Sequence, residues 1–228
     1  MWLKAWKKLP PNMQHDAVKQ YYDLLKHRRL SMLFKRLFDI LLSLIGIILL
    51  SPVLLILSIM IKVDSKGPVL FKQVRVKQYG KTFKIWKFRT MVVNAEKMGA
   101  QLTTQNDSRI TKVGNMIRKC RLDEFPQLFN ILKGDMSFVG ARPEVPKYVD
   151  AYTPEMRATL LLPQGVTALS SIKFKDESDM LDSSDNPEET YVEEILPIKM
   201  TYNLEYLRNF SLWEDVKLMF ATVYYVLK

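Results

Sequence analysis

Residues 40–61 read ILLSLIGIILLSPVLLILSIMI, an uncharged run bounded by Asp39 and Lys62. As a straight α-helix this run would be about 33 Å long at 1.5 Å per residue, which matches the hydrocarbon thickness of a bilayer. A soluble core helix is rarely so uniformly apolar, and no small-residue cleavage site of the signal-peptide type follows the run. We therefore expect residues 33–62 to form a helix embedded in a membrane.

The centre of the run carries Ser51-Pro52, and both of its flanks are basic. Because proline has no N–H, Pro52 cannot bond to the Ile48 carbonyl, and the helix should bend there. The Ser51 hydroxyl can bond to the carbonyl that is left free. The flanking cations are Lys26, Arg28, Arg29, Lys35 and Arg36 before the run and Lys62, Lys66, Lys72, Arg75 and Lys77 after it. Since basic flanks favour the cytoplasmic side, we expect a re-entrant helix that enters and leaves by one face, with a kinked single span as the alternative.

Positive charge is concentrated in the middle of the 228-residue chain. The net charge is +10 overall, and by position it is +6 over residues 1–65, +11 over 66–142 and −7 over 143–228. Such a basic field indicates an anionic partner, which could be nucleic acid, anionic lipid or a phosphorylated small molecule. One cysteine and two histidines exclude a disulfide framework and a multi-histidine metal site. No zinc finger, RNA-binding signature or basic zipper is present, so we expect no nucleic-acid partner.

The remaining patterns predict an α+β fold that is mainly α. Residues 69–76 and 82–90 are β-rich and are joined through Gly80, which is typical of a small β-hairpin. Residues 1–32 and 212–228 have amphipathic patterns, and each is expected to lie at the membrane interface or to pack on the body of the protein. We divide the chain into an interfacial extension (1–32), the membrane helix (33–62) and a cytoplasmic domain (63–228).

The stretch that can carry chemistry is RLDEFPQLFNILKG, residues 121–134. In one interpretation Asp123 is the N-cap of a helix, Glu124 favours its dipole and Gly134 is its C-cap. In the other, the two carboxylates form a phosphate-handling site, in which one attacks phosphorus and the other holds Mg²⁺. Arg142 precedes a proline that stiffens the backbone, and its guanidinium suits bidentate contact with phosphate.

The chain resembles the bacterial sugar transferase family, the monotopic phosphoglycosyl transferases, over about residues 33 to 228. The resemblance is carried by Lys35-Arg36-Leu-Phe-Asp39, Ser51-Pro52, Gly67-Pro-Val-Leu-Phe-Lys-Gln-Val-Arg75, Phe83-Lys-Ile-Trp-Lys-Phe-Arg-Thr-Met91, Arg109-Ile-Thr-Lys-Val-Gly114, the stretch from Leu122 to Ser137, and Val139-Gly-Ala-Arg-Pro143. Residues 1–30 lie outside it, and the acidic stretch 176–194 departs from the common pattern.

The resemblance implies a monotopic protein with a helix broken at Ser51-Pro52 and a catalytic domain on the cytoplasmic face of the bacterial inner membrane. It implies transfer of a sugar 1-phosphate from a UDP-sugar to polyprenyl (undecaprenyl) phosphate, which gives polyprenyl-diphosphate-sugar and UMP. This reaction begins the assembly of capsule, O-antigen or glycoprotein glycans. By the same resemblance Asp123 is the nucleophile that forms an aspartyl-phosphosugar intermediate, Glu124 helps to bind Mg²⁺, and Arg142 contacts phosphate.

Further basic residues match family positions and are candidates for binding phosphate or lipid headgroups: Lys72, Arg75, Lys87, Arg89, Arg109 and Lys112. The expected partners are the donor, the lipid acceptor and membrane lipids, and the oligomeric state is open between a monomer and a homodimer. A membrane-anchored binding protein without catalysis is one alternative function. A single-span protein with a nucleic-acid-binding domain is another.

Overall fold

The computed structural model describes residues 3–95, 107–174 and 177–227. Its helices are α1 (Asp16–Lys26), α2 (Arg29–Asp64), α3 (Lys112–Lys119), α4 (Gln127–Lys133), α5 (Pro146–Asp150), α6 (Leu169–Lys173), α7 (Glu177–Asp182), α8 (Pro187–Thr190), α9 (Leu196–Asn209) and α10 (Leu212–Leu227). Its strands are β1 (Leu70–Val76), β2 (Thr82–Phe88), β3 (Ser137–Val139) and β4 (Gly165–Thr167). Short 3-10 turns and one π-helical turn connect them, and the mainly helical α+β class is confirmed.

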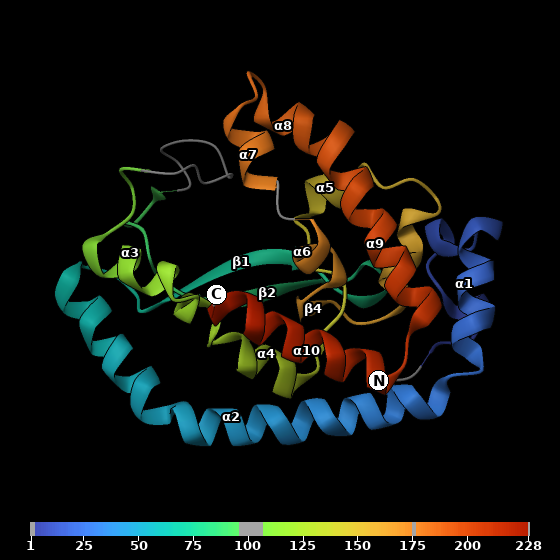
Figure 1. The fold of residues 1–228 in the computed structure, drawn as a ribbon, viewed down its shortest axis with the longest axis horizontal. Coiled ribbons are helices and arrows are strands. Elements are labelled where there is room, and N and C mark those ends of the chain that lie inside the picture. Colours follow the sequence, from blue (N-terminus) through green and yellow to red (C-terminus); the bar gives the residue numbers. More distant parts are fainter. Residues whose placement is uncertain (1–2, 96–106, 175–176, 228) are drawn as a thin grey trace.

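Helix α2 is long, apolar and bent. It contains the whole of the uncharged run together with Pro52, and it is long and apolar enough to cross a membrane. Figure 1 shows it running beneath the other elements and changing direction beyond its middle. The Ser51 hydroxyl donates to the Ile48 carbonyl at 2.8 Å, so the expected replacement for the bond that proline removes is confirmed. The helix is bent rather than interrupted, because its helical hydrogen-bonding pattern continues through Pro52.

One side of α2 packs on the body of the protein, whereas the other side is exposed and apolar. At its N-terminal end Lys35, Asp39 and Ser43 are buried, and at its C-terminal end Leu57 and Ile61 are buried. The exposed apolar side chains of α2 are Leu30, Phe34, Leu37, Ile40, Leu41, Leu44, Ile45, Ile48, Leu49, Val53, Leu55, Ile56, Ile59 and Val63. Helix α10 adds exposed Trp213, Phe220, Val223, Tyr224 and Tyr225, although its Asp215 and Leu218 are buried. These two helices thus leave an apolar surface of the kind that a membrane covers.

Buried polar contacts join the N-terminal end of α2 to the domain. The Lys35 ammonium donates to the Val139 carbonyl and to Asp215 Oδ2, both at 2.7 Å. Asp39 Oδ1 accepts hydrogen bonds from the Ser137 hydroxyl and from the Phe138 backbone N–H. Helix α2 therefore holds strand β3 directly by charged side chains.

Strands β1 and β2 form the expected antiparallel hairpin, in which Lys72 pairs with Trp86 and Arg75 pairs with Phe83. The connecting turn has Tyr79 and Gly80 in the left-handed region, with φ of 63° and 72°. Asn130 of α4 covers the outer edge of β2, because its Oδ1 accepts from the Trp86 N–H and its Nδ2 donates to the Lys84 carbonyl. Helix α4 is therefore fixed to the hairpin as well as to α2.

Strands β3 and β4 form a short parallel pair, with Ser137 opposite Gly165 and Val139 opposite Thr167. Two glycines permit this pairing because the backbones approach very closely. A Cβ on Gly140 would lie 2.3 Å from the Pro163 carbonyl oxygen, and one on Gly165 would lie 2.2 Å from the Gly140 nitrogen. The strand pair therefore fixes the position of the backbone that leads to Arg142.

The N-terminal segment packs into the largest hydrophobic core. Val18, Tyr21, Tyr22 and Leu25 of α1 are buried against residues of η6 (Met156–Leu161) and α9. Of the two alternatives for this segment, the structure supports packing on the body of the protein. The division at residues 32 and 62 remains a prediction.

Candidate active site

The two adjacent carboxylates lie in a tight turn that is separate from the following helix. Asp123 and Glu124 belong to a 3-10 turn, Leu122–Glu124, and α4 begins only after Pro126. The expectation that Asp123 caps this helix is therefore wrong, whereas the C-cap at Gly134 is confirmed by its left-handed φ of 84°. The physical reason is Arg121, whose left-handed φ of 56° turns the chain immediately before the pair.

Two cations from distant parts of the chain converge on Glu124. Its Oε1 accepts from Arg142, which follows β3, at 2.5 Å and from Lys87, on β2, at 3.1 Å. Burial alone would raise the pKa of Glu124, but Arg142 and Lys87 outweigh it and hold that pKa well below its ordinary value. In turn, Glu124 raises the pKa of Arg142, whereas burial lowers the pKa of Lys87. Glu124 is thus a firmly ionised carboxylate.

Asp123 is in a different state from its neighbour. It forms no ion pair with any residue in the described ranges. Burial raises the pKa of the Asp123 carboxyl, with a further contribution from the charge of Glu124, while Lys87 and Arg118 act in the opposite direction. A carboxylate that is partly desolvated and not engaged by a cation is a better nucleophile than one held in a salt bridge.

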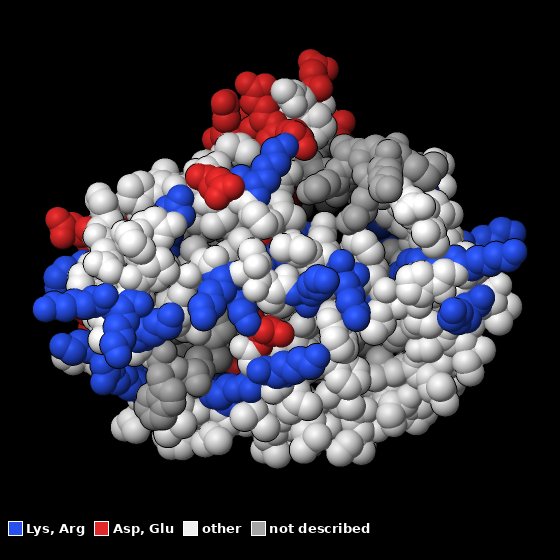
Figure 2. Space-filling view, turned by 180° about the vertical axis from the view of Figure 1, so that it is seen from behind, with Lys and Arg blue, Asp and Glu red and all other residues white. Residues whose placement is uncertain are grey.

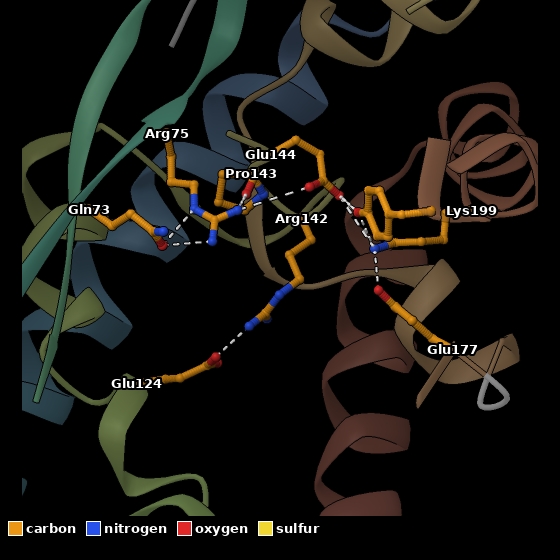
Figure 3. A network of polar contacts seen from close by, with 9 residues as sticks. Gln73, Arg75, Glu124, Arg142, Pro143, Glu144, Glu177 and Lys199 are labelled. Carbon is orange, nitrogen blue, oxygen red and sulfur yellow. Dashed lines mark hydrogen bonds and ion pairs between the residues drawn. The ribbon is translucent and has the colours of Figure 1, made fainter. Parts of the chain in front are cut away.

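A second set of polar contacts involves Pro143 and Glu144, which follow Arg142 in sequence, and extends toward α7 and α9 (Figure 3). Arg75 donates to the Pro143 carbonyl at 3.2 Å and lies 4.0 Å from Glu144 Oε2. The Tyr191 hydroxyl donates to Glu144 at 2.7 Å. The Lys199 ammonium lies 3.4 Å from Glu144 and 3.0 Å from Glu177, and it donates to the Tyr191 oxygen at 2.9 Å. The backbone beside Arg142 is therefore braced from both sides.

The structure brings together only some of the candidate residues. Asp123, Glu124, Lys87 and Arg142 form one cluster, and Arg75 adjoins it. The other four candidates have contacts elsewhere or none that is described. The Arg89 guanidinium is buried and donates to the Lys66 and Ser65 carbonyls after α2. Arg109 bonds to Asp107 and to the Ala95 carbonyl. Lys72 lies over the Trp86 ring, and Lys112 is exposed at the start of α3.

Asp123 and Glu124, called the dyad below, have oxygen ligands that fit a Mg²⁺ ion arriving with phosphate groups. Mg²⁺ sites in phosphate-handling proteins use one or two carboxylates, with the remaining ligands from water and substrate phosphates. Glu124 uses Oε1 for both cations, and its Oε2 has no hydrogen bond to the described part of the chain. Glu124 Oε2 and the Asp123 carboxylate are therefore oxygen atoms on one turn that could act as metal ligands. No cluster of three or more His, Cys, Asp or Glu side chains suited to a metal occurs among the described residues.

Sequence reasoning missed Glu144, Tyr191, Lys199 and Glu177. Lys199 could have been found from its position, because it occupies the buried face of α9 together with Leu196, Met200 and Asn203. A lysine at a core position needs a partner. Glu144 follows Arg142-Pro143 directly, but nothing in the local sequence indicates that it faces α9.

These features define a class: a site of two adjacent carboxylates and convergent cations, in a chain that also carries a long apolar helix. The chain belongs to the bacterial sugar transferase family, whose family model matches residues 30–228. This family assignment agrees with the motifs that carry the resemblance.

Three relatives illustrate the similarity. A UDP-glucose:undecaprenyl-phosphate glucose-1-phosphate transferase of Klebsiella pneumoniae is 39% identical over 199 residues, which are 86% of this chain and 40% of the relative. A protein of the same name in Caulobacter vibrioides is 32% identical over 83% of this chain and 68% of the relative. A putative undecaprenyl-phosphate N-acetylgalactosaminyl 1-phosphate transferase of Bacillus subtilis is 44% identical over 54% of this chain and 68% of the relative. The chain spans about two fifths of the length of several of the curated relatives it matches.

Proposed function

We propose that this protein transfers a sugar 1-phosphate from a UDP-sugar to polyprenyl phosphate through a phosphosugar intermediate on Asp123. The observation that carries the proposal is the unequal pair of carboxylates: Glu124 is neutralised by Arg142 and Lys87, whereas Asp123 beside it has no ion-pair partner among the described residues. The names of the relatives supply the donor and acceptor classes.

The chemistry balances in two steps at one site. In the first, an Asp123 oxygen attacks the phosphorus that bears the sugar, the bond from this phosphorus to the bridging oxygen breaks, and UMP leaves with that oxygen. In the second, an oxygen of polyprenyl phosphate attacks the same phosphorus, and the bond to Asp123 breaks to regenerate its carboxylate. Splitting the transfer lets a bulky donor and a lipid acceptor use one small site in turn.

The basic cluster makes these steps feasible, since a carboxylate must attack an anionic diphosphate. The Arg142 guanidinium and the Lys87 ammonium lie beside the dyad and can take phosphate oxygens as negative charge develops. Mg²⁺ held by Glu124, with oxygens of the diphosphate, would add neutralising charge at the leaving group. The contacts of Arg75 with Pro143 and Glu144 keep the segment that bears Arg142 in place.

The test is release of UMP in a single turnover. The full chain, purified into phospholipid nanodiscs free of polyprenyl phosphate, would be given Mg²⁺ and a panel of UDP-sugars, first without and then with undecaprenyl phosphate. Without acceptor, we expect a burst of UMP equal to the enzyme present and a mass increase of one phosphosugar on the peptide that contains Asp123. The variant Asp123→Asn should give neither signal.

Two outcomes would contradict the proposal. UMP release in Asp123→Asn at the wild-type rate would remove the nucleophile assignment. UMP release that strictly requires the acceptor, without any modified peptide, would favour direct transfer between donor and lipid. Asp135→Asn is a suitable control variant, because Asp135 pairs with Lys77 away from the dyad.

We further propose that α2 is re-entrant and keeps the catalytic domain at the cytoplasmic face of the inner membrane. Support comes from the contacts of its two ends, which both join the same body. Lys35 near the start reaches Val139 and Asp215, and Asp64 at the end accepts a hydrogen bond from the Val113 N–H of α3. A helix that crossed the bilayer would separate its ends by the full membrane thickness.

Topology can be tested by thiol labelling in intact cells, in a Cys120→Ser background because Cys120 is exposed. Single cysteines would be placed at Lys26 and Lys81, one on each side of α2. An impermeant maleimide should label neither position until the membrane is permeabilised. Labelling of one position alone in intact cells would show a single span.

A further inference from the structure

Two lysines from different elements converge on one aromatic ring at the outer side of the hairpin. The Lys72 ammonium of β1 lies 4.9 Å from the centroid of the Trp86 ring, and the Lys133 ammonium at the end of α4 lies 4.0 Å from it. Trp86 also contacts Phe129, at 5.9 Å between ring centroids. The ring is partly exposed and both lysines are exposed. Lys72, Trp86 and Lys133 are called the Trp86 cluster below.

The Trp86 cluster lacks a counter-charge. Within the described part of the chain, neither the Lys72 nor the Lys133 side-chain ammonium forms an ion pair or a hydrogen bond. Lysines nearby are paired: Lys77 bonds to Asp135, and Lys87 bonds to Glu124. Two ammonium groups that share a ring repel each other, and a bound anion would relieve this repulsion.

The Trp86 cluster is distinct from the active site. Alternate residues of a strand point to opposite faces of the sheet, so Trp86 and Lys87 face opposite ways. Lys87 reaches the dyad, whereas Trp86 and its partner in the register, Lys72, lie on the other face. An anion at the Trp86 cluster would therefore not occupy the position of the reacting phosphate groups.

The Trp86 cluster lies next to the apolar surface of α2. Helix α4 packs on α2, with Leu128 against Gly46. The Arg36 guanidinium donates to the Ile131 and Leu132 carbonyls, in the last turn before Lys133. Seen from behind in Figure 2, Lys and Arg side chains lie across the middle of the molecule, and its lower edge, at the height where α2 runs in Figure 1, is largely white. If α2 is embedded in the membrane, Lys133 therefore lies at the level of the lipid headgroups.

We infer that the Trp86 cluster binds the headgroup phosphate of an anionic phospholipid. Tryptophan is favoured at the membrane–water interface, and lysine ammonium groups bind lipid phosphate there. Charge complementarity and continuity with the exposed side of α2 support this occupant. The inference depends on the membrane embedding proposed above, and it does not depend on the transfer chemistry.

The experiment compares lipid preference in nanodiscs. The full chain would be reconstituted in phosphatidylcholine discs that contain a trace of spin-labelled phosphatidylglycerol or spin-labelled phosphatidylcholine, at 50 mM NaCl. The fraction of motionally restricted label gives the preference for the anionic lipid. We expect the wild type to prefer phosphatidylglycerol. The variant Lys72→Gln/Lys133→Gln should lower that preference by up to about 30-fold, because each lysine near the surface contributes about a fivefold factor.

Matched variants separate the local site from overall charge. Lys8→Gln/Lys26→Gln removes the same charge from exposed positions of the N-terminal segment, and it should keep the preference. Lys72→Arg/Lys133→Arg keeps both charges and should also retain it. An equal loss in the Lys8/Lys26 variant, or no loss in the Lys72/Lys133 variant, would overturn the inference.

Two further arms distinguish the occupant and the dependence on other proposals. Inorganic phosphate at 10 mM, compared with chloride at equal ionic strength, should leave the preference unchanged; displacement would show a site for free anions instead of a headgroup. Asp123→Asn should lose UMP release and keep the lipid preference. If α2 does not embed, the chain will not co-purify with the discs, which separates that failure from a failure of the Trp86 cluster.

Discussion

Removal of the Lys35 charge should destabilise the protein strongly, and the size of the effect follows from the structure. Lys35 and Asp215 are 2% and 3% exposed, and their charged atoms are 2.7 Å apart. The variant Lys35→Met leaves Asp215 buried, with the Tyr206 hydroxyl as its remaining side-chain donor among the described residues. Loss of one partner from a buried pair costs about 3–5 kcal/mol. For a chain of this size each kcal/mol lowers Tm by roughly 2–4 °C, so a fall of about 10 °C is expected.

A double-mutant cycle can separate the pair from its surroundings. Lys35→Met/Asp215→Leu also removes the carboxylate that Lys35→Met leaves unpaired, so stability should recover in part, with a coupling energy of about 2 kcal/mol or more. Asp39 is also buried and still loses the nearby charge of Lys35, which limits the recovery. Recovery will be incomplete because the Tyr206 hydroxyl then loses its acceptor. The assay is thermal unfolding in detergent, followed by intrinsic fluorescence and circular dichroism.

The control is Lys62→Met, which removes an exposed lysine at the other end of α2 and should change stability by about 0.5 kcal/mol or less. A loss below about 1 kcal/mol in Lys35→Met would refute the buried ion pair. Strictly additive losses in the double variant would show that the two side chains do not interact.

Three other results are expected. Burial raises the pKa of Asp123, and as the proposed nucleophile this carboxylate must be ionised, so single-turnover UMP release should decline as pH falls through a value above 3.8. A rate that stays flat through this range would contradict the proposed role. Glu124→Gln should slow UMP release by about 10²-fold without abolishing it, because the proposed nucleophile Asp123 remains while the proposed Mg²⁺ ligand is weakened; rates at saturating Mg²⁺ measure this. Gly114→Ala should cost about 1–3 kcal/mol, since its Cβ would lie 2.0 Å from the Thr90 carbonyl oxygen, whereas Gly46→Ala, with its nearest neighbour at 3.4 Å, should be neutral or stabilising in thermal unfolding.

Local patterns predicted much of this fold because their causes are local. The apolar run and Pro52 dictate a bent helix, and the Ser51 hydroxyl takes the free carbonyl as the sequence indicates. The β-rich runs around Gly80 gave a correct hairpin, since the turn needs a residue that accepts positive φ.

Other features depend on partners that are distant in sequence. Lys35 and Asp215 are 180 residues apart, and Glu124 and Lys87 are 37 residues apart. Local spacing also missed the left-handed Arg121, which keeps Asp123 out of the helix. The basic candidates could not be ranked from composition, because an arginine that bonds to carbonyls after α2 looks the same in sequence as one that binds phosphate.

The Asn130 amide protects an edge of the β1–β2 sheet from pairing with another copy of the protein in a crowded membrane. Its oxygen and nitrogen bond to the Trp86 N–H and the Lys84 carbonyl, two groups that another strand would otherwise pair with. A two-stranded sheet with an unpaired edge can pair with a strand from a neighbouring molecule, which is a route to aggregation. Confinement to two dimensions raises the frequency of such encounters. The Asn130 amide thus occupies the Trp86 N–H and the Lys84 carbonyl, so a strand of a neighbouring molecule cannot pair with β2 at these two groups.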